Sequence, residues 1–532
     1  MAKEFDYIIV GAGSSGCVIA ERLTADGRTS VLLLEAGERD NSFLIDMPKG
    51  IGKLLANPKY TWTYTTEAES GIESGETWVR GRVLGGSSSI NGMMYNRGRP
   101  EDYDSLVEVG CPGWGWDDIL PYFRAMEDHE LGANEWRGSG GPMRITLPEA
   151  GGRLGTAILE AGSQAGLSVE ADFNTPAGHG LISYFPRTIG NGQRWSAARA
   201  YLGPARNRPN LTVRTGTTVE AILFEGRRAV GVRSSGDPGT VFKARCEIIL
   251  AAGGIESPAL LQRSGIGPGD LLSSLGIPVV QESGEVGRNL LEHRVLSVNW
   301  RTAPEYSLNH HFSGWRLYGH VMRYLLTRGG LMATGFAEVG ALVETRKGLS
   351  RPNAQLLFAP YSIDRTVSPP AIEAQPGITV SGFILRPTSK GYLNIRGREA
   401  GKSPRIKVNY LDTEHDRQAA VEILQYIRGL ALTPALGAIG ASEVFPGPEA
   451  SSAEEVVDAW RRLGHCGYHL VGGCRMGSDE RSVVDPRLKV RGVDSLRVFD
   501  CSVLPIMIAG NTNGPIMAMA ARAADIIKAD AG

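Results

Sequence analysis

The sequence predicts an α/β fold in which a dinucleotide-binding domain of the Rossmann type is interrupted by a second domain. The first forty residues follow the order strand, glycine turn, helix, strand. Residues 300–455 differ in character, with apolar residues at helical spacing and short strands separated by prolines. An alanine-rich helical stretch, residues 516–527, closes the chain. We therefore expect the chain to leave the nucleotide-binding domain and to return to it.

Length and composition indicate a globular protein of more than one domain. A chain of 532 residues is too long for one simple core. With 42% hydrophobic and 21% charged residues and a net charge of −1, nothing electrostatic predicts nucleic acid or an anionic membrane as a partner. The sequence holds no run of 18 apolar residues for a membrane span and no secretory leader pattern. We expect a cytoplasmic protein, monomeric or homodimeric.

The first glycine turn has the pattern of a dinucleotide site. A buried strand over residues 7–10 is followed by Gly11, Gly13 and Gly16, and the next strand ends at Glu35. These glycines allow a tight turn, close approach of a pyrophosphate and packing of helix on strand, while the free N–H groups of the helix start favour phosphate. The carboxylate suits two ribose hydroxyls and would repel the 2′-phosphate of NADP. The motif alone does not separate FAD from NAD.

A second glycine-rich stretch, residues 81–98, is more specific. Its sequence GRVLGGSSSINGMMYNRG offers unhindered backbone N–H groups between Gly85 and Ser88, suited to an anion or to the edge of a flat polar ring. Asn91 and Gly92 can bring the main chain against a planar cofactor.

With these motifs the chain resembles the glucose–methanol–choline (GMC) oxidoreductase family. Residues 81–98 resemble its first signature, and GGIESPALLQRSGIG (253–267) resembles its second. EVGRNLLEH (285–293), LRPTSKG (385–391), YHLVGGCRMG (468–477) and FDCSVLP (499–505) match further landmarks in order. The resemblance implies a Rossmann-like FAD-binding domain, made of residues 1–155, 205–299 and 456–532. It also implies a discontinuous substrate-binding domain, an antiparallel sheet with helices, made of residues 156–204 and 300–455.

The resemblance also implies the residues that contact FAD. They are Gly11, Gly13, Ser14, Ser15, Gly16, Glu35, Ala36, Trp62, Arg82, Val83, Gly86, Ser87, Asn91, Gly92, Met93, Met94, Val219, Asp500, Cys501, Pro515 and Ile516. Some relatives attach the flavin covalently through a histidine where this chain has Ile90. An isoleucine cannot form that bond, so we expect non-covalent FAD.

The same resemblance implies a catalytic pair. Oxidation of an alcohol by a flavin needs a group that takes the hydroxyl proton while the carbon lies against the flavin. His469, on a loop before a glycine pair, has the position of the family's active-site histidine, and Asn513 has that of a histidine or asparagine partner. We expect His469 to act as base and Asn513 to orient the substrate oxygen. Leu470 and Gly473 depart from the residues common in the family.

The substrate is predicted less closely. Phe312, Trp315, Phe336, Phe358 and Tyr361 are candidates for pocket walls, and alternation over residues 380–395 predicts one strand of the substrate-domain sheet. The aromatic residues favour a moderately apolar primary alcohol; a choline-like cation would need an aromatic cage and a carboxylate, for which Glu338 is a candidate. Either oxygen or a quinone-like carrier could accept the electrons.

Alternative functions stay open. They are oxidation of a sugar or polyol, a lyase of the hydroxynitrile type that keeps FAD without redox chemistry, a non-enzymatic flavoprotein, and an NAD-dependent dehydrogenase. No metal site is expected, because His310, His311 and His465 have no carboxylate or cysteine at ligand spacing.

Overall fold

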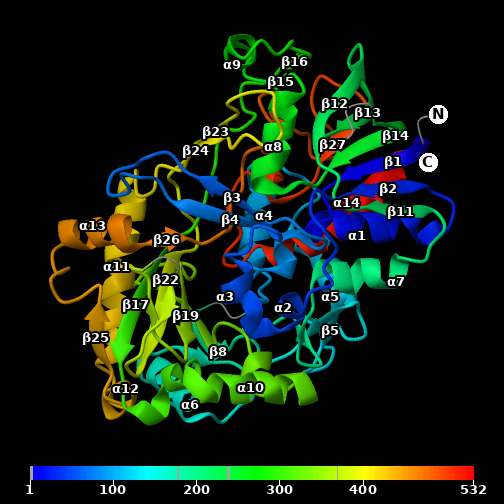
Figure 1. Cartoon of the computed structure of the whole chain (residues 1–532). Coiled ribbons are helices and arrows are strands. Elements are labelled where there is room, and N and C mark those ends of the chain that lie inside the picture. The colour runs from blue at the N-terminus through cyan, green and yellow to red at the C-terminus, as the bar shows by residue number, and fades with distance from the viewer. Residues whose placement is uncertain (1–3, 177–178, 236–239, 368–369, 532) are drawn as a thin grey trace.

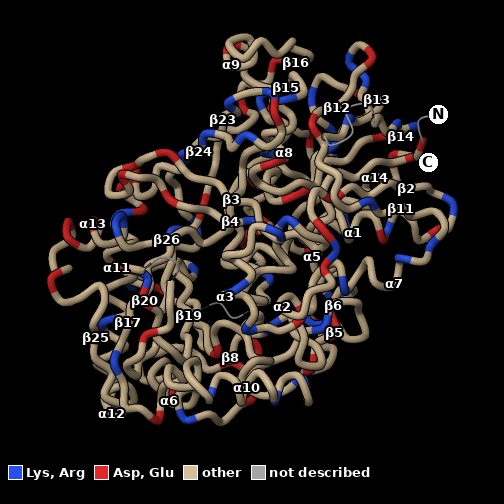
Figure 2. The backbone as a smooth tube through the Cα atoms, viewed as in Figure 1, with Lys and Arg blue, Asp and Glu red and all other residues tan. Residues whose placement is uncertain are grey.

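The structure is a computed structural model that describes residues 4–176, 179–235, 240–367 and 370–531. Two large β-sheets, one of seven and one of eight strands, lie at opposite sides of the molecule, and helices cover both (Figure 1). Charges of both signs are interspersed along the backbone (Figure 2). None of the helices in the described part is both long enough and apolar enough to cross a membrane.

The seven-stranded sheet confirms the predicted α/β fold. Its order is β11 (Leu211–Arg214), β2 (Val31–Leu34), β1 (Glu4–Val10), β14 (Val241–Leu250), β13 (Arg228–Ser234) and β12 (Val219–Glu225), with β27 (Leu496–Val498) also beside β14. Strands β11, β2, β1, β14 and β27 pair in parallel, and β12 and β13 pair antiparallel. Because parallel strands are covered on both faces, β2 is an uninterrupted buried apolar run.

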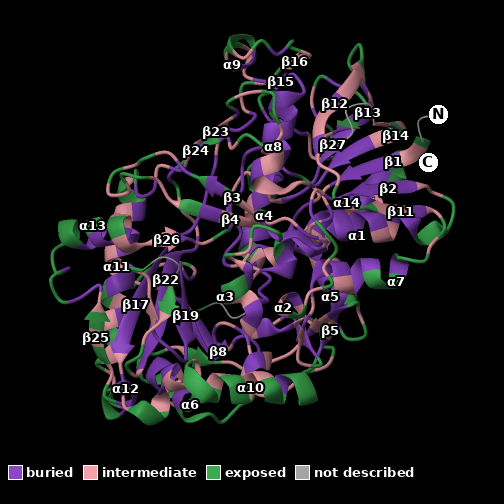
Figure 3. Ribbon diagram, in the orientation of Figure 1, coloured by how far each residue is buried: buried purple, intermediate pink, exposed green. Residues whose placement is uncertain are grey.

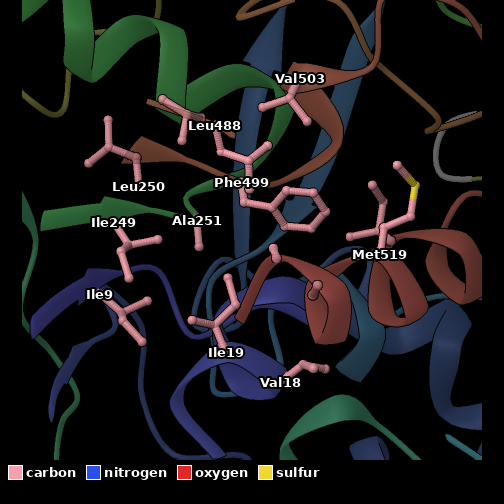
Figure 4. Close-up of a cluster of buried hydrophobic side chains, with 14 of the residues drawn as sticks. Ile9, Val18, Ile19, Ile249, Leu250, Ala251, Leu488, Phe499, Val503 and Met519 are labelled. Carbon is pink, nitrogen blue, oxygen red and sulfur yellow. The ribbon is translucent and has the colours of Figure 1, made fainter. Parts of the chain in front are cut away.

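Two helices from opposite ends of the chain cover this sheet together. Helix α1 (Ser14–Leu23) packs against α14 (Asn513–Ala531), which confirms the predicted terminal helix. Side chains such as Ile9, Ile249 and Phe499 gather with Ile19 and Met519 in one hydrophobic cluster (Figure 4). The end of the chain is therefore part of the same core as its beginning.

The eight-stranded sheet is antiparallel except for its edge pair of β7 and β8. Its order is β25 (Ser442–Phe445), β17 (Arg294–Arg301), β22 (Gly377–Ile384), β19 (Ala354–Ala359), β18 (Val339–Val343), β8 (Leu181–Tyr184) and β7 (Ser168–Val169), with β26 (His465–Cys466) also beside β17. Helices α6 (Arg153–Gln164), α11 (Glu414–Ala431) and α13 (Ala453–Leu463) pack against it in a second core.

Shorter elements surround the two sheets and fill the space between them. The helices are α2 (Phe43–Asp46), α3 (Ile51–Leu54), α4 (Pro100–Glu108), α5 (Trp116–Met126), α7 (Gly203–Ala205), α8 (Gly253–Arg263), α9 (Gly269–Ser274), α10 (Gly314–Thr327) and α12 (Pro434–Ala438). The strands are β3 (Thr61–Thr65), β4 (Thr77–Gly81), β5 (Glu127–His129), β6 (Met143–Ile145), β9 (Ile189–Gly190), β10 (Gln193–Arg194), β15 (Ile266–Gly267), β16 (Gln281–Glu282), β20 (Ile363–Asp364), β21 (Ala371–Ile372), β23 (Tyr392–Asn394) and β24 (Arg405–Lys407).

The boundaries expected from the sequence differ from the elements in five places. The single strand predicted over residues 380–395 is wrong: β22 ends at Ile384, Pro387 follows, and β23 starts only at Tyr392. Proline has no N–H to donate to a strand partner. All four predicted domain boundaries fall inside elements: 155/156 in α6, 204/205 in α7, 299/300 in β17 and 455/456 in α13. The division into two discontinuous domains stays a prediction.

Gly16 and Gly13 provide a matched test of the first turn. A Cβ at Gly16 would overlap the carbonyl oxygen of Gly11, whereas the atom nearest to a Cβ at Gly13 is 4.0 Å away. We expect Gly16→Ala to destabilise the apoprotein by about 1–3 kcal/mol, the usual cost of overpacking. Gly13→Ala should unfold at the wild-type temperature. Thermal unfolding of both apoproteins measures the difference, and equal midpoints would contradict this account of the turn.

Candidate active site and cofactor cavity

A cavity of about 350 Å³ is lined by segments from many parts of the chain. Its walls include the turn between β1 and α1, the end of β2, the glycine-rich residues 86–94 and the start of α8. The loop at residues 467–470 and the turn at residues 511–513 complete it. The cavity thus brings together the first glycine turn, the second glycine-rich stretch and the predicted catalytic histidine.

The β1–α1 turn has the features of a dinucleotide site. Gly11 has φ +103°, which favours glycine. Glu35 accepts hydrogen bonds from Ala12 N at 3.0 Å and Gly37 N at 2.8 Å, and burial raises the pKa of its carboxyl to about 7. No side chain caps the N-terminus of α1, so its N–H groups are available to phosphate. These residues fit the dinucleotide cofactor expected from the sequence.

The second glycine-rich stretch lies directly against this turn. A Cβ at Gly86 would come within 2.8 Å of the Cα of Gly13. A side chain at residue 86 would therefore push apart the two backbone segments that form one wall of the cavity.

Most residues predicted to contact the cofactor do line the cavity. They are Gly11, Gly13, Ser14, Ser15, Glu35, Ala36, Trp62, Gly86, Ser87, Asn91, Gly92, Met93, Met94, Val219, Asp500, Cys501 and Ile516. Gly16, Arg82, Val83 and Pro515 are not among the lining residues. The guanidinium of Arg82 instead stacks 4.5 Å from the ring centre of Trp62, and Val83 is fully buried.

His469 lies at the centre of a chain of buried polar side chains. Its Nδ1 is 2.8 Å from His293 Nδ1, and its Nε2 is 3.1 Å from Asn511 Nδ2. Gln355 Nε2 donates to Asn511 Oδ1 at 3.2 Å. On the far side, His293 Nε2 is 3.0 Å from the carbonyl oxygen of Leu385.

These contacts fix the proton positions on both rings. A carbonyl oxygen can only accept, so His293 carries its proton on Nε2 and accepts at Nδ1. His469 Nδ1 must then donate to His293, which leaves the lone pair of His469 at Nε2, beside Asn511. Burial is the main cause that holds the pKa of His469 well below its usual 6.5 and lowers that of His293 to about 4. At neutral pH His469 Nε2 is therefore unprotonated, and its lone pair accepts from the Asn511 amide.

One carboxyl group holds the two histidine loops together. Glu292 Oε1 accepts from the backbone N–H of His469 at 2.6 Å and from that of His293 at 2.9 Å. Its Oε2 lies 3.3 Å from Arg80 Nη2, and Arg80 itself lines the cavity. Burial raises the pKa of Glu292 to about 7, against the effect of Arg80. Arg80 also contributes to the lowered pKa of His469.

The structure places Asn511, and not Asn513, within hydrogen-bond distance of His469; the expected role of Asn513 in orienting the substrate oxygen stays a prediction. Asn513 Oδ1 accepts from Ser14 Oγ at 2.7 Å, at the start of α1. Asn513 is the first residue of α14, so its side chain joins the two packed helices, whereas Asn511 precedes the helix and reaches the histidine. Two asparagines two residues apart in a turn cannot be told apart from sequence.

The five aromatic residues expected as pocket walls are not among the residues that line the cavity. Trp315 is 79% exposed, and Phe358 is buried in the core of the eight-stranded sheet. Phe312 and Phe336 each form an edge contact with Tyr361. The aromatic residues that do line the cavity are Trp62, Tyr64 and Tyr468.

Sequence reasoning also missed His293, Glu292 and Arg80. EVGRNLLEH marks the segment that ends at His293, but nothing in it shows contact with His469. That contact arises because β17, which follows His293, pairs with β26, which precedes His469.

The fold and the cavity define an oxidoreductase with a dinucleotide cofactor: a Rossmann-type turn and a buried basic histidine share one cavity. Comparison with known protein families identifies the family to which the chain belongs. The GMC oxidoreductase family matches over residues 5–295 with its N-terminal part and over residues 387–520 with its C-terminal part. The chain belongs to the GMC oxidoreductase family, and it is an FAD-dependent oxidoreductase that acts on CH–OH groups.

Individual relatives resemble the chain over nearly its whole length. It is 39% identical over 538 residues to the mitochondrial choline dehydrogenase of Homo sapiens, which covers 99% of this chain and 90% of the relative. It is 37% identical over 541 residues to the oxygen-dependent choline dehydrogenase of Pseudomonas fluorescens (strain Pf0-1), covering 99% and 94%.

Solved structures give the same picture. Pyridoxine 4-oxidase from Mesorbium loti superposes with a TM-score of 0.87 at 32% identity, covering 98% of both chains. An Aspergillus oryzae formate oxidase superposes with a TM-score of 0.92 at 25% identity, covering 99% of both.

His293 offers a test of how the proton of His469 is positioned. We expect His293→Leu to lower kcat by about 10²-fold or more, because His469 Nδ1 loses its acceptor and the ring its fixed tautomer. His293→Gln can still accept from His469 and should recover part of the loss. Steady-state kinetics at saturating substrate, with FAD content determined for each variant, provide the measurement. Equal loss in both variants would show that His293 acts only through packing.

Proposed function

We propose that this chain oxidises a neutral primary alcohol to the aldehyde, with His469 Nε2 as the proton acceptor and Asn511 as the group that holds the substrate oxygen. The observation that supports this most directly is the chain of fixed hydrogen bonds from Leu385 to His469. It leaves the lone pair of His469 at Nε2, where it accepts from the Asn511 amide, and both residues line the cavity. FAD, when bound, supplies the acceptor for the hydride that leaves the alcohol carbon.

The residues divide the proton chemistry between them. The hydroxyl proton moves to His469 Nε2 as the C–H hydride leaves, and the Asn511 amide donates to the oxygen on which negative charge develops. The lowered pKa of His469 keeps it in the free-base form before the substrate binds. The proton and the hydride both come from one neutral alcohol, so the site and its bound cofactor together gain no net charge in this step.

The charges around His469 favour a neutral alcohol over a cation such as choline. Arg80 lines the cavity next to this site, held by Glu292. Three carboxyl groups line the cavity, and each has partners: Glu35 at the β1–α1 turn, Glu256 with Arg263 at 2.9 Å, and Asp500 with Gly253 N at 2.8 Å. A quaternary ammonium needs a cage with compensating negative charge.

Glu338, the candidate carboxylate from the sequence, does not supply that charge. It is not among the residues that line the cavity, and the cations that act on it electrostatically are Lys49 and Arg187.

The FAD of this chain is proposed to be non-covalent. Ile90 lines the cavity at the position where some family members carry a flavin-linked histidine, and it is 3% exposed. A saturated hydrocarbon side chain has no atom that can bond to the flavin.

A comparison of alcohols tests the proposed substrate class. We expect benzyl alcohol to bleach the flavin absorbance of the anaerobic holoprotein and to exceed choline in kcat/KM at least about tenfold, a difference of about 1.4 kcal/mol. Glucose serves as a sugar control. Faster reduction by choline would overturn the preference for a neutral substrate. If no alcohol in a wide panel reduces the flavin, the lyase alternative gains support.

Variants of the two asparagines test which of them holds the substrate oxygen. We expect Asn511→Ala to lower kcat by about 10²-fold, the usual effect of removing one such donor, with normal FAD content. Asn513→Ala should weaken FAD binding by loss of the Ser14 contact, while turnover at saturating FAD stays near wild type. His469→Ala is the reference for loss of the base, with an expected loss of about 10²–10⁴-fold. The reverse pattern for the two asparagines would return the role to Asn513.

A further inference from the structure

Helix α10 has two apolar faces and packs only one of them. On its inner face Leu317, Val321 and Tyr324 belong to a cluster that includes Met47 and Met332. Tyr324 is fully buried there. This contact holds α10 on the outside of the molecule, where it forms one edge of the structure (Figure 1).

The outer face of α10 exposes five large apolar side chains. The exposed fraction is 79% for Trp315, 74% for Tyr318, 54% for Met322, 48% for Leu325 and 80% for Leu326. Spacings of three and four residues place them along one side of the helix. Figure 3 shows this helix as largely exposed, with its outer side open to solvent. Such clustering on one helix marks an interaction surface, whereas single exposed apolar residues are common.

The charged residues of the segment that carries this face are all basic. Residues 306–337 contain Arg316, Arg323 and Arg328 and no aspartate or glutamate. Within the described residues none of these arginines forms an ion pair. Arg328 lies over the ring of Tyr324 at 5.2 Å, while Arg316 and Arg323 are exposed on α10 itself.

We propose that the outer face of α10 binds the surface of an anionic lipid bilayer. The helix would lie in the plane of the interface, with Trp315, Tyr318 and Leu326 at the boundary between headgroups and acyl chains. Arg316 and Arg323 would face the lipid phosphates and carboxylates.

Charge complementarity selects lipid over a second copy of the chain. A twofold contact between two α10 helices would bring arginines of the same sign together without any carboxylate from this segment. The net charge of −1 for the whole chain conceals this local excess of positive charge. The proposal depends on neither the alcohol oxidised nor the electron acceptor.

Vesicle flotation of the full-length FAD-loaded protein tests the proposal. We expect it to float with vesicles of equal parts phosphatidylcholine and phosphatidylserine, and much less with phosphatidylcholine alone. Both the Trp315→Ser/Leu326→Ser and the Arg316→Glu/Arg323→Glu double variants should lose binding at least about tenfold. Leu432→Ser is the matched control, because Leu432 is 86% exposed on a different part of the surface.

The outcomes separate lipid binding from the alternatives. Unchanged thermal unfolding and dye-coupled turnover of each variant show that the fold is intact, as expected for exposed positions. Absence of wild-type flotation, or equal flotation of the variants and wild type, would overturn the proposal. So would light scattering that shows a wild-type dimer lost in Trp315→Ser/Leu326→Ser while flotation persists, since a second copy would then cover the face.

Discussion

A hydrogen bond between two buried imidazoles sets the chemistry around which the rest of the site is arranged. His293 is fixed by the Leu385 carbonyl, and His469 is fixed by His293, so donors point in one direction along the chain. Burial keeps both rings neutral. A lone histidine could present either nitrogen to the cavity, whereas this pair presents only Nε2 of His469 as an acceptor. The carbonyl oxygen of Leu385, which takes no part in the reaction, thus determines the tautomer of His469.

The groups around that nitrogen come from both sheets. Gln355 lies on β19 of the eight-stranded sheet, and it fixes the amide of Asn511, which lies two residues before α14 begins at the seven-stranded sheet. His293 and His469 flank the paired strands β17 and β26. The cofactor turn belongs to β1 and α1, which share their core with α14. Distances at the site therefore depend on how the two sheets are positioned relative to each other.

Local signals allowed the nucleotide half of this arrangement to be predicted. The strand–turn–helix around Gly11, the carboxylate Glu35 and the glycine-rich stretch are contiguous patterns, and the structure brings them together as expected.

The hydrogen-bond partner of His469 was not predictable, because Asn511 and Asn513 differ only in whether they precede or begin a helix. The aromatic residues expected in the pocket walls lie elsewhere for another reason. Residues such as Phe358 pack in the core of the eight-stranded sheet, and periodicity does not distinguish a core residue from one that lines a cavity. The exposure of the second face of α10 could not be predicted for the same reason. Trp315 and Leu325 fit helical spacing whether they face the core or the solvent.

Glu292 limits how this site can open. One oxygen of its carboxyl group accepts from the backbone of both His293 and His469, so the two loops cannot separate without leaving buried amides unsatisfied. They must move as one unit or stay still. An opening of the cavity that keeps both hydrogen bonds must therefore move other parts of the lining, which include Ile51 of α3 and Leu55, the residue that follows it.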